Sequence, residues 1–175
     1  MSKKNVTRLL ALLFTIGLSV AIYSFRDQAQ QLAQYGYVGI FLLAFLAYAT
    51  VILPAPGVAI VFTMGGVFHP AGVALAAGAG AALGEISGYL AGYSGQAVLE
   101  HVGSYEKLAG WMKKGGPLTV FLLAAIPNPF FDLAGAVAGA LKMPLHKFLF
   151  WCWLGETIKM LAFAYAGAKF IGWIG

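Results

Sequence analysis

Two short proline motifs interrupt long apolar stretches of this 175-residue chain, Pro54-Ala55-Pro56 and Pro127-Asn128-Pro129. Proline removes a backbone donor and clashes with the preceding helical turn, so no straight helix passes through either motif. Each motif is followed at similar offsets by a glycine, a proline, Leu-Gly-Glu and Tyr-x-Gly. Paired, proline-broken apolar segments in two halves of a chain indicate a transporter-like membrane site.

The repeated residues define two segments, 35–95 and 117–173. They are Gly66, Pro70, Leu83-Gly84-Glu85 and Tyr93-Ser94-Gly95 in the first segment, and Gly139, Pro144, Leu154-Gly155-Glu156 and Tyr165-Ala166-Gly167 in the second. We predict that each segment is a re-entrant helical hairpin followed by one transmembrane helix. Such a unit crosses the membrane an odd number of times, so the second copy must be inverted relative to the first.

The amino-acid composition indicates that this chain folds within a lipid bilayer. Hydrophobic residues make up 61% of it and charged residues only 10%, whereas a soluble domain carries about 25% charged residues. The 23 glycines favour close packing of membrane helices, and the alternation of β-barrel strands is not seen. The predicted fold is therefore an all-α integral membrane protein with a single domain over residues 1–175.

Two further elements complete the predicted architecture. An apolar run at 9–25 follows three basic residues and lacks a small-residue cleavage site, which predicts a retained N-terminal transmembrane helix. The segment 96–116 alternates apolar and charged residues, which predicts an amphipathic helix in the membrane interface.

The basic residues predict the orientation. With a cytoplasmic N-terminus and two re-entrant hairpins, only Arg26 and Lys169 lie outside. The cytoplasmic side then holds Lys3, Lys4, Arg8, Lys107, Lys113, Lys114, Lys142 and Lys147. This bias agrees with the positive-inside rule, although a topology with one full crossing in place of a hairpin stays open.

Four charged residues in or beside apolar helices are the predicted substrate or ion pathway: Glu85, Asp132, Glu156 and Lys159. Charges inside a bilayer are costly and mark functional sites. Glu156 and Lys159 are three residues apart and share a helix face, so a purely structural ion pair is the alternative. Asp132 could instead complement a helix N-terminus. The four charges sum to minus two, and a bound proton or cation would reduce their cost.

The predicted hairpin tips are Pro54, Pro56, Gly57, Pro127, Asn128 and Pro129. Irregular backbone at membrane depth must be buried in protein or reached by water, so the tips should meet near the midplane and line a cavity. Asn128 followed by Pro129 is typical of an N-cap and first helical position. Two converging helix N-termini suit an anionic group.

No catalytic, metal-binding or nucleotide-binding motif stands out. Cys152 is the one cysteine, which disfavours a cysteine-based metal site. The net charge of +5 indicates contact with anionic lipid rather than nucleic acid. We therefore predict no enzyme activity and no cofactor.

Over residues 35–172 the chain resembles the DedA/VTT family of membrane proteins, also called SNARE-associated Golgi proteins. The residues that carry the resemblance are Leu53–Gly57, Gly65–Phe68, Gly80–Glu85 with Gly88, Tyr89 and Gly92, Ala125–Pro129, Ala138, Gly139, Met143, Leu154 and Gly155. The resemblance implies two opposed re-entrant hairpins and movement of lipids between leaflets. We predict a prokaryotic cytoplasmic membrane as the location, with the N-terminus in the cytoplasm. Bacterial members are associated with undecaprenyl phosphate recycling, and eukaryotic members with phospholipid scrambling.

The chain departs from the bacterial pattern at both tips. The arginines that flank the second motif in bacterial-type members are replaced by Ala124 and Phe130, and Val58 and Ala59 stand where an acid is usual. These departures favour scrambling of phospholipid over proton-coupled capture of a polyprenyl phosphate. The predicted function is a lipid transporter or scramblase whose partners are anionic lipid headgroups and a coupling proton. Alternatives are a proton- or cation-coupled carrier of a soluble solute, and a non-transporting scaffold. Homo-oligomerisation stays open.

Overall fold

The computed structural model describes residues 35–49, 57–95, 105–128 and 131–174, and every regular element in these ranges is an α-helix. The predicted first helix at 9–25 lies outside them. The helices are α3 (Gly36–Ala49), α4 (Gly57–Gly65), α5 (Pro70–Gly84), α6 (Ile86–Ser94), α8 (Tyr105–Gly115), α9 (Pro117–Ala125), α10 (Phe131–Ala140) and α11 (Leu145–Ile174). The all-α prediction is confirmed for this part of the chain.

Prolines set several helix boundaries. Pro70 and Pro117 occupy the starts of α5 and α9, where the missing N–H would have no intrahelical partner in any case. At the second motif, α9 ends at Ala125, and Ile126 is extended, with φ −103° and ψ 128°. Helix resumes at Phe131 as α10. The predicted break in the apolar stretch 117–141 is therefore present.

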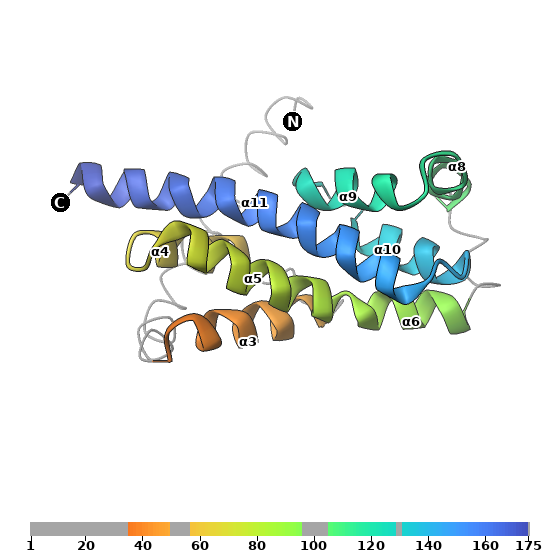
Figure 1. The fold of residues 1–175 in the computed structure, drawn as a ribbon, viewed down its shortest axis with the longest axis horizontal. Helices are drawn as coiled ribbons and strands as arrows, with labels where there is room; N and C mark the ends of the chain where they lie inside the picture. The colour runs from red at the N-terminus through yellow and green to blue at the C-terminus, as the bar shows by residue number, and fades with distance from the viewer. Residues whose placement is uncertain (1–34, 50–56, 96–104, 129–130, 175) are drawn as a thin grey trace, which may run out of the picture.

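Two long rods and two short helix pairs make up the bundle (Figure 1). The α5–α6 rod and α11 run along the bundle in opposite directions and pack against each other. The α3/α4 pair reaches toward the middle from the end where α11 finishes. The α9/α10 pair reaches toward the middle from the opposite end (Figure 1).

The helix contacts have a matched pattern. The first helix of each pair packs on the rod of its own half, α3 on α5 and α9 on α11. The second helix of each pair packs on the rod of the other half, α4 on α11 and α10 on α6. If α3, α4 and the α5–α6 rod are matched with α9, α10 and α11, the major helix contacts of the two halves therefore correspond.

The repeated Leu-Gly-Glu triplet marks equivalent crossings in the two halves. A Cβ atom on Gly84 would lie 2.7 Å from the Phe45 carbonyl oxygen of α3. A Cβ atom on Gly155 would lie 2.6 Å from the Phe121 carbonyl oxygen of α9. Only glycine permits helix backbones to approach so closely. The two glutamates that follow are consequently presented at corresponding points of the bundle.

The surface of the bundle is largely apolar. Exposed side chains include Leu42, Leu46, Leu75, Leu90, Leu118, Leu122, Phe150, Ile158 and Phe170. The combined stretch Pro70–Ser94 spans 25 residues and is long and apolar enough to cross a membrane, the one helix of the described ranges that meets both criteria. The crossing predicted for α11 stays a prediction.

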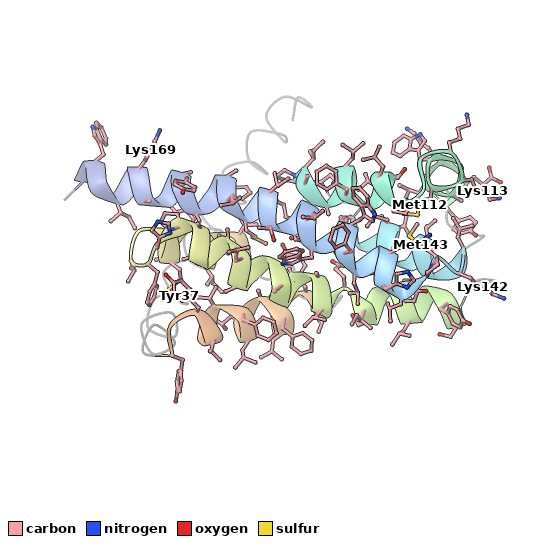
Figure 2. The ribbon with its side chains drawn as sticks, in the orientation of Figure 1. Tyr37, Met112, Lys113, Lys142, Met143 and Lys169 are labelled. Atoms are coloured by element: carbon pink, nitrogen blue, oxygen red, sulfur yellow. The ribbon has the colours of Figure 1, made fainter. Side chains whose placement is uncertain are left out.

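The described lysines outside the core gather at the two ends of the bundle. Lys113 and Lys142 lie at one end and Lys169 at the other (Figure 2). Lys107 and Lys114 share α8 with Lys113, and Lys147 lies in the first turn of α11 near Lys142. The grouping of these six lysines agrees with the predicted one.

Candidate functional site

The centre of the site is a buried ion pair on α11. The Lys159 Nζ atom lies 2.6 Å from Glu156 Oε1, and the two side chains are 8% and 0% exposed. The i,i+3 spacing places both on one helix face, as the sequence predicted. Transfer of two charges out of water is costly, and their attraction offsets that cost only when the geometry is close.

Two aromatic rings complete the surroundings of the Lys159 ammonium. Its nitrogen lies 5.5 Å from the centroid of the Tyr48 ring and 5.4 Å from that of Phe131. A cation over a ring face is attracted by the ring quadrupole, by about 2 kcal/mol when the group is desolvated. Among the described residues, Lys159 is therefore held by the Glu156 carboxylate and the two rings, a set that we call the lysine box.

The rings of the lysine box come from both repeats. Tyr48 lies in the last described turn of α3, six residues before Pro54, and Phe131 opens α10, two residues after Pro129. Gly57, a predicted tip residue, opens α4 against the same tyrosine, because a Cβ there would lie 3.2 Å from Tyr48 Cε2. Described residues from both repeats thus converge on Lys159.

Glu85 is buried at the junction of α5 and α6, with 3% of its surface exposed. The backbone continues helically through it, since its N–H donates to Ala81 and its carbonyl accepts from Tyr89. Its Oε2 atom lies 3.1 Å from the place that a Cβ of Gly135 would occupy. The lack of a side chain at Gly135 therefore leaves room for this carboxylate against α10.

Cys152 lies one turn before Glu156 on α11, and its side chain is fully buried. It belongs to the same buried apolar cluster as Phe131 and Phe148.

The amide of Asn128 caps the end of α9. Its Nδ2 atom donates to the carbonyl oxygens of Leu123 and Ile126, each at 2.7 Å. In the other half, the Ser87 hydroxyl donates to the Ala49 carbonyl at the end of α3, at 3.0 Å. The last described carbonyl of α3 and carbonyls at the end of α9 are thus each satisfied by a side chain. The predicted N-cap role of Asn128 toward α10 stays a prediction.

Several predicted site residues are only partly placed. Pro127 lies exposed after α9. The tip residues Pro54, Pro56 and Pro129 lie outside the described residues. The backbone of Asp132 is in the first turn of α10, and its side chain lies outside the description. The predicted cavity between the tips also involves these segments and stays a prediction.

Sequence reasoning missed Tyr48, Phe131 and Gly135 as parts of the site. An aromatic residue close to each proline motif was the one available signal for the first two. A further missed feature is Thr157, whose buried hydroxyl has no hydrogen-bond partner among the described residues. It faces Gly78 where α5 and α11 cross.

Comparison with known proteins gives one match. The sequence model of the VTT domain family matches residues 53–169. No curated protein and no solved structure matches the chain. The matched range includes residues 53–95 of the first repeat and nearly all of the second. It contains Glu85, Glu156 and every member of the lysine box except Tyr48.

Proposed function

We propose that this chain, which belongs to the VTT domain family, moves lipids between the leaflets of a membrane without covalent chemistry. In this proposal α3/α4 and α9/α10 are re-entrant hairpins that enter from opposite sides, as an inverted repeat, and α5–α6 and α11 cross the bilayer. A lipid headgroup passes through the middle of the bundle while its tails stay in the surrounding lipid.

The observation that carries the proposal is the position of Lys159. It is a cation buried between the rings of Tyr48 in α3 and Phe131 in α10, one from each repeat. Ionisable groups inside a membrane bundle mark transport pathways, and sites at broken helices are typical of transporters built from inverted repeats. The apolar outer surface supports contact with lipid tails.

The lysine box suggests how a phosphate would be received. Oxygen atoms of a headgroup phosphate would replace Glu156 Oε1 at the Lys159 ammonium, since both are anionic acceptors for the same donor. The rings of Tyr48 and Phe131 would keep the ammonium in place during the exchange. Glu156, Glu85 and Asp132 would then adjust the local charge or carry a proton.

One observation favours a second candidate, a structural lock. The Lys159 charge is already neutralised by Glu156 at 2.6 Å, so the pair could serve only to join α11 to the helices around it. The two candidates differ in what happens when both charges are removed together. If the pair is only structural, the variant without either charge keeps its packing and its activity. If the pair belongs to a lipid path, the same variant lacks the cation and loses activity.

The test compares Lys159→Met with the double variant Glu156→Gln/Lys159→Met, using flipping of fluorescent phospholipid in liposomes at matched amounts of protein. The single variant leaves a buried carboxylate uncompensated, which costs about 3–5 kcal/mol of stability. The double variant removes that penalty. We expect both variants to flip lipid far more slowly than the parent.

Lys169→Met is the matched control, because this lysine lies at the far end of the bundle (Figure 2) and should leave the rate unchanged. A double variant that flips lipid at the parent rate would establish the structural lock. A parent protein that moves no lipid, yet transports a soluble solute with protons, would establish the carrier alternative instead.

The proposed topology has its own test. The basic cluster at the α8 end is placed in the cytoplasm and Lys169 outside, following the positive-inside rule. In a Cys152→Ser background, single cysteines at Arg26 and Lys113 should react with a membrane-impermeant thiol reagent from opposite faces. Labelling of both positions from the same face would show that the hairpins or the first helix are arranged differently.

A further inference from the structure

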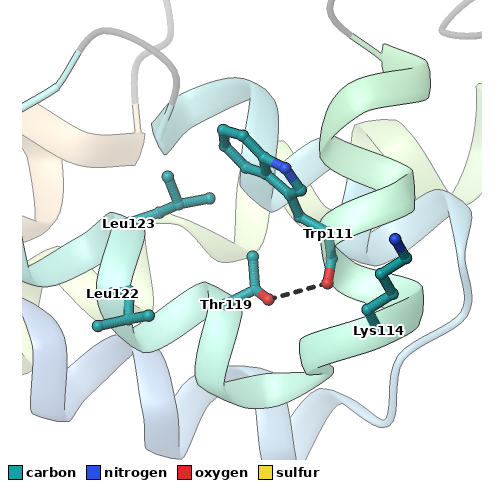
Figure 3. A pocket seen from close by; sticks show the side chains of 5 residues that line it. All are labelled: Trp111, Lys114, Thr119, Leu122 and Leu123. Carbon is teal, nitrogen blue, oxygen red and sulfur yellow. Dashed lines mark hydrogen bonds between the residues drawn. The ribbon is translucent and has the colours of Figure 1, made fainter.

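A pocket of about 340 Å³ lies at the corner between α8 and α9, away from the lysine box (Figure 3). It is lined by Trp111, Lys114, Thr119, Leu122 and Leu123. Its volume falls at the lower end of the ~300–1,000 Å³ that is usual for small-molecule sites. The lining joins an apolar wall to a single ammonium, an arrangement suited to an amphipathic ligand.

The corner that forms the pocket is fixed by its backbone. Gly116 has a φ of +54°, which favours glycine, and Pro117 starts α9 directly after it. The Thr119 hydroxyl donates to the Trp111 carbonyl at 3.1 Å and ties the two helices together (Figure 3). The pocket is therefore formed before a ligand arrives.

The orientation of α8 suits a helix in the membrane interface. In Figure 1 α8 is seen nearly end-on while α9 and α11 run across the view, so α8 lies crosswise to the long rods. Among the described helices, α8 separates apolar and charged residues most strongly. Leu108 and Met112 pack into the core, while Trp111 is 46% exposed. An interfacial amphipathic helix has this distribution.

The charge around the pocket selects the ligand. Lys107, Lys113 and Lys114 are exposed on α8 against one acid, Glu106. The Lys107 ammonium lies 5.1 Å from the Trp111 ring centroid, so the indole is flanked by positive charge. Anionic lipids are attracted to such clusters at a membrane surface.

We propose that the α8/α9 corner binds one anionic phospholipid. The phosphate lies at the Lys114 ammonium, and an acyl chain lies along Leu122, Leu123 and the Trp111 indole. This lipid is not cargo, because the pocket is at the end of the bundle and shares no residue with the lysine box. The bound lipid ties α8, and through it the start of α9, to the negatively charged leaflet.

The test uses quenching of tryptophan fluorescence by brominated acyl chains in bilayers that contain the full chain. The Trp111 signal is the difference between the parent and Trp111→Phe. At equal mole fractions, brominated phosphatidylglycerol should quench this signal more than brominated phosphatidylcholine. Lys114→Gln should weaken the apparent affinity for phosphatidylglycerol about fivefold, whereas the control Lys169→Gln should leave it unchanged.

Three results would overturn the proposal. One is equal quenching by the two lipids, which would mean that Trp111 reports ordinary contact with the bilayer. Another is a preference for phosphatidylglycerol that Lys114→Gln leaves intact, which would place the anionic site elsewhere. Displacement of the lipid by soluble glycerol phosphate would likewise contradict it, because a free anion would then suffice. None of these readings depends on lipid flipping.

Discussion

Each half of the molecule has a glutamate directly after a close-packed glycine, at equivalent positions of the repeat. The surroundings of the two glutamates nevertheless differ. In the second half Glu156 is followed three residues later by Lys159, and the two side chains form the buried ion pair. In the first half Gly88 occupies that position after Glu85. Glu85 faces Gly135 of α10, in the other half. The comparison shows that the packing is repeated, whereas a lysine three residues after the glutamate occurs in the second half alone.

The single lysine nevertheless belongs to both halves. Of the two rings that hold its ammonium, Tyr48 comes from the first half and Phe131 from the second. With one lysine against Glu85, Asp132 and Glu156, the predicted pathway residues carry a net formal charge of −2. A bound proton or cation would reduce the cost of that charge inside a membrane.

The largest expected effect comes from neutralising the two glutamates separately. Glu156→Gln removes the carboxylate of a buried ammonium, so we expect a loss of about 3–5 kcal/mol in the free energy of unfolding. Glu85→Gln keeps the shape of the side chain beside Gly135, so the packing against α10 should be retained. Among neutral substitutions of the acids, it should nevertheless cause the largest drop in the flipping rate, when that rate is divided by the amount of folded protein. The reason is that it removes an acid from the proposed pathway.

Both variants can be measured in one detergent preparation, by chemical unfolding and by flipping after reconstitution. Glu156→Gln/Lys159→Met serves as the stability control, since it removes both charges of the pair. Equal stability losses in the two single variants would mean that Glu85 also compensates a buried charge. The two halves would then have similar charge chemistry in spite of the single lysine.

Much of the fold follows from local sequence signals. The proline motifs predicted the break that the structure has after Ala125, and the alternation of charges predicted the amphipathic character of α8. The spacing of Glu156 and Lys159 predicted that they share a helix face. These features depend on neighbours within a few residues, which sequence patterns record directly.

The aromatic part of the site could not be predicted in this way. Tyr48, Phe131 and Lys159 come from three different helices, and their contact depends on how α3, α10 and α11 pack. The sequence also suggested a cap on α10 for Asn128, while its amide in the structure donates backward to α9. Both Asn128 arrangements are compatible with the same local sequence, so only the fold could reveal this one.

A smaller effect tests whether the two halves are packed equivalently. Gly84→Ala and Gly155→Ala each place a methyl group within 2.7 Å of a backbone oxygen on the facing helix. The helices must move apart, and overpacking of this kind costs about 1–3 kcal/mol. Because the two crossings have the same geometry, we expect similar losses in the two variants.

Gly110→Ala is the control for the glycine substitutions, because a Cβ at this position in α8 would meet nothing within 4 Å. Replacing a helical glycine by alanine without a clash should stabilise the protein by about 0.5–1 kcal/mol. A gain in the free energy of unfolding therefore reports helix propensity, and a loss reports a packing clash. The free energy of unfolding of all three variants would be measured in the same detergent. If Gly84→Ala is neutral while Gly155→Ala is costly, the first half tolerates a wider helix separation than the second. The two Leu-Gly-Glu triplets would then be alike in sequence but not in helix packing. Close packing at the glycine would no longer explain why Glu85 and Glu156 occupy matched positions.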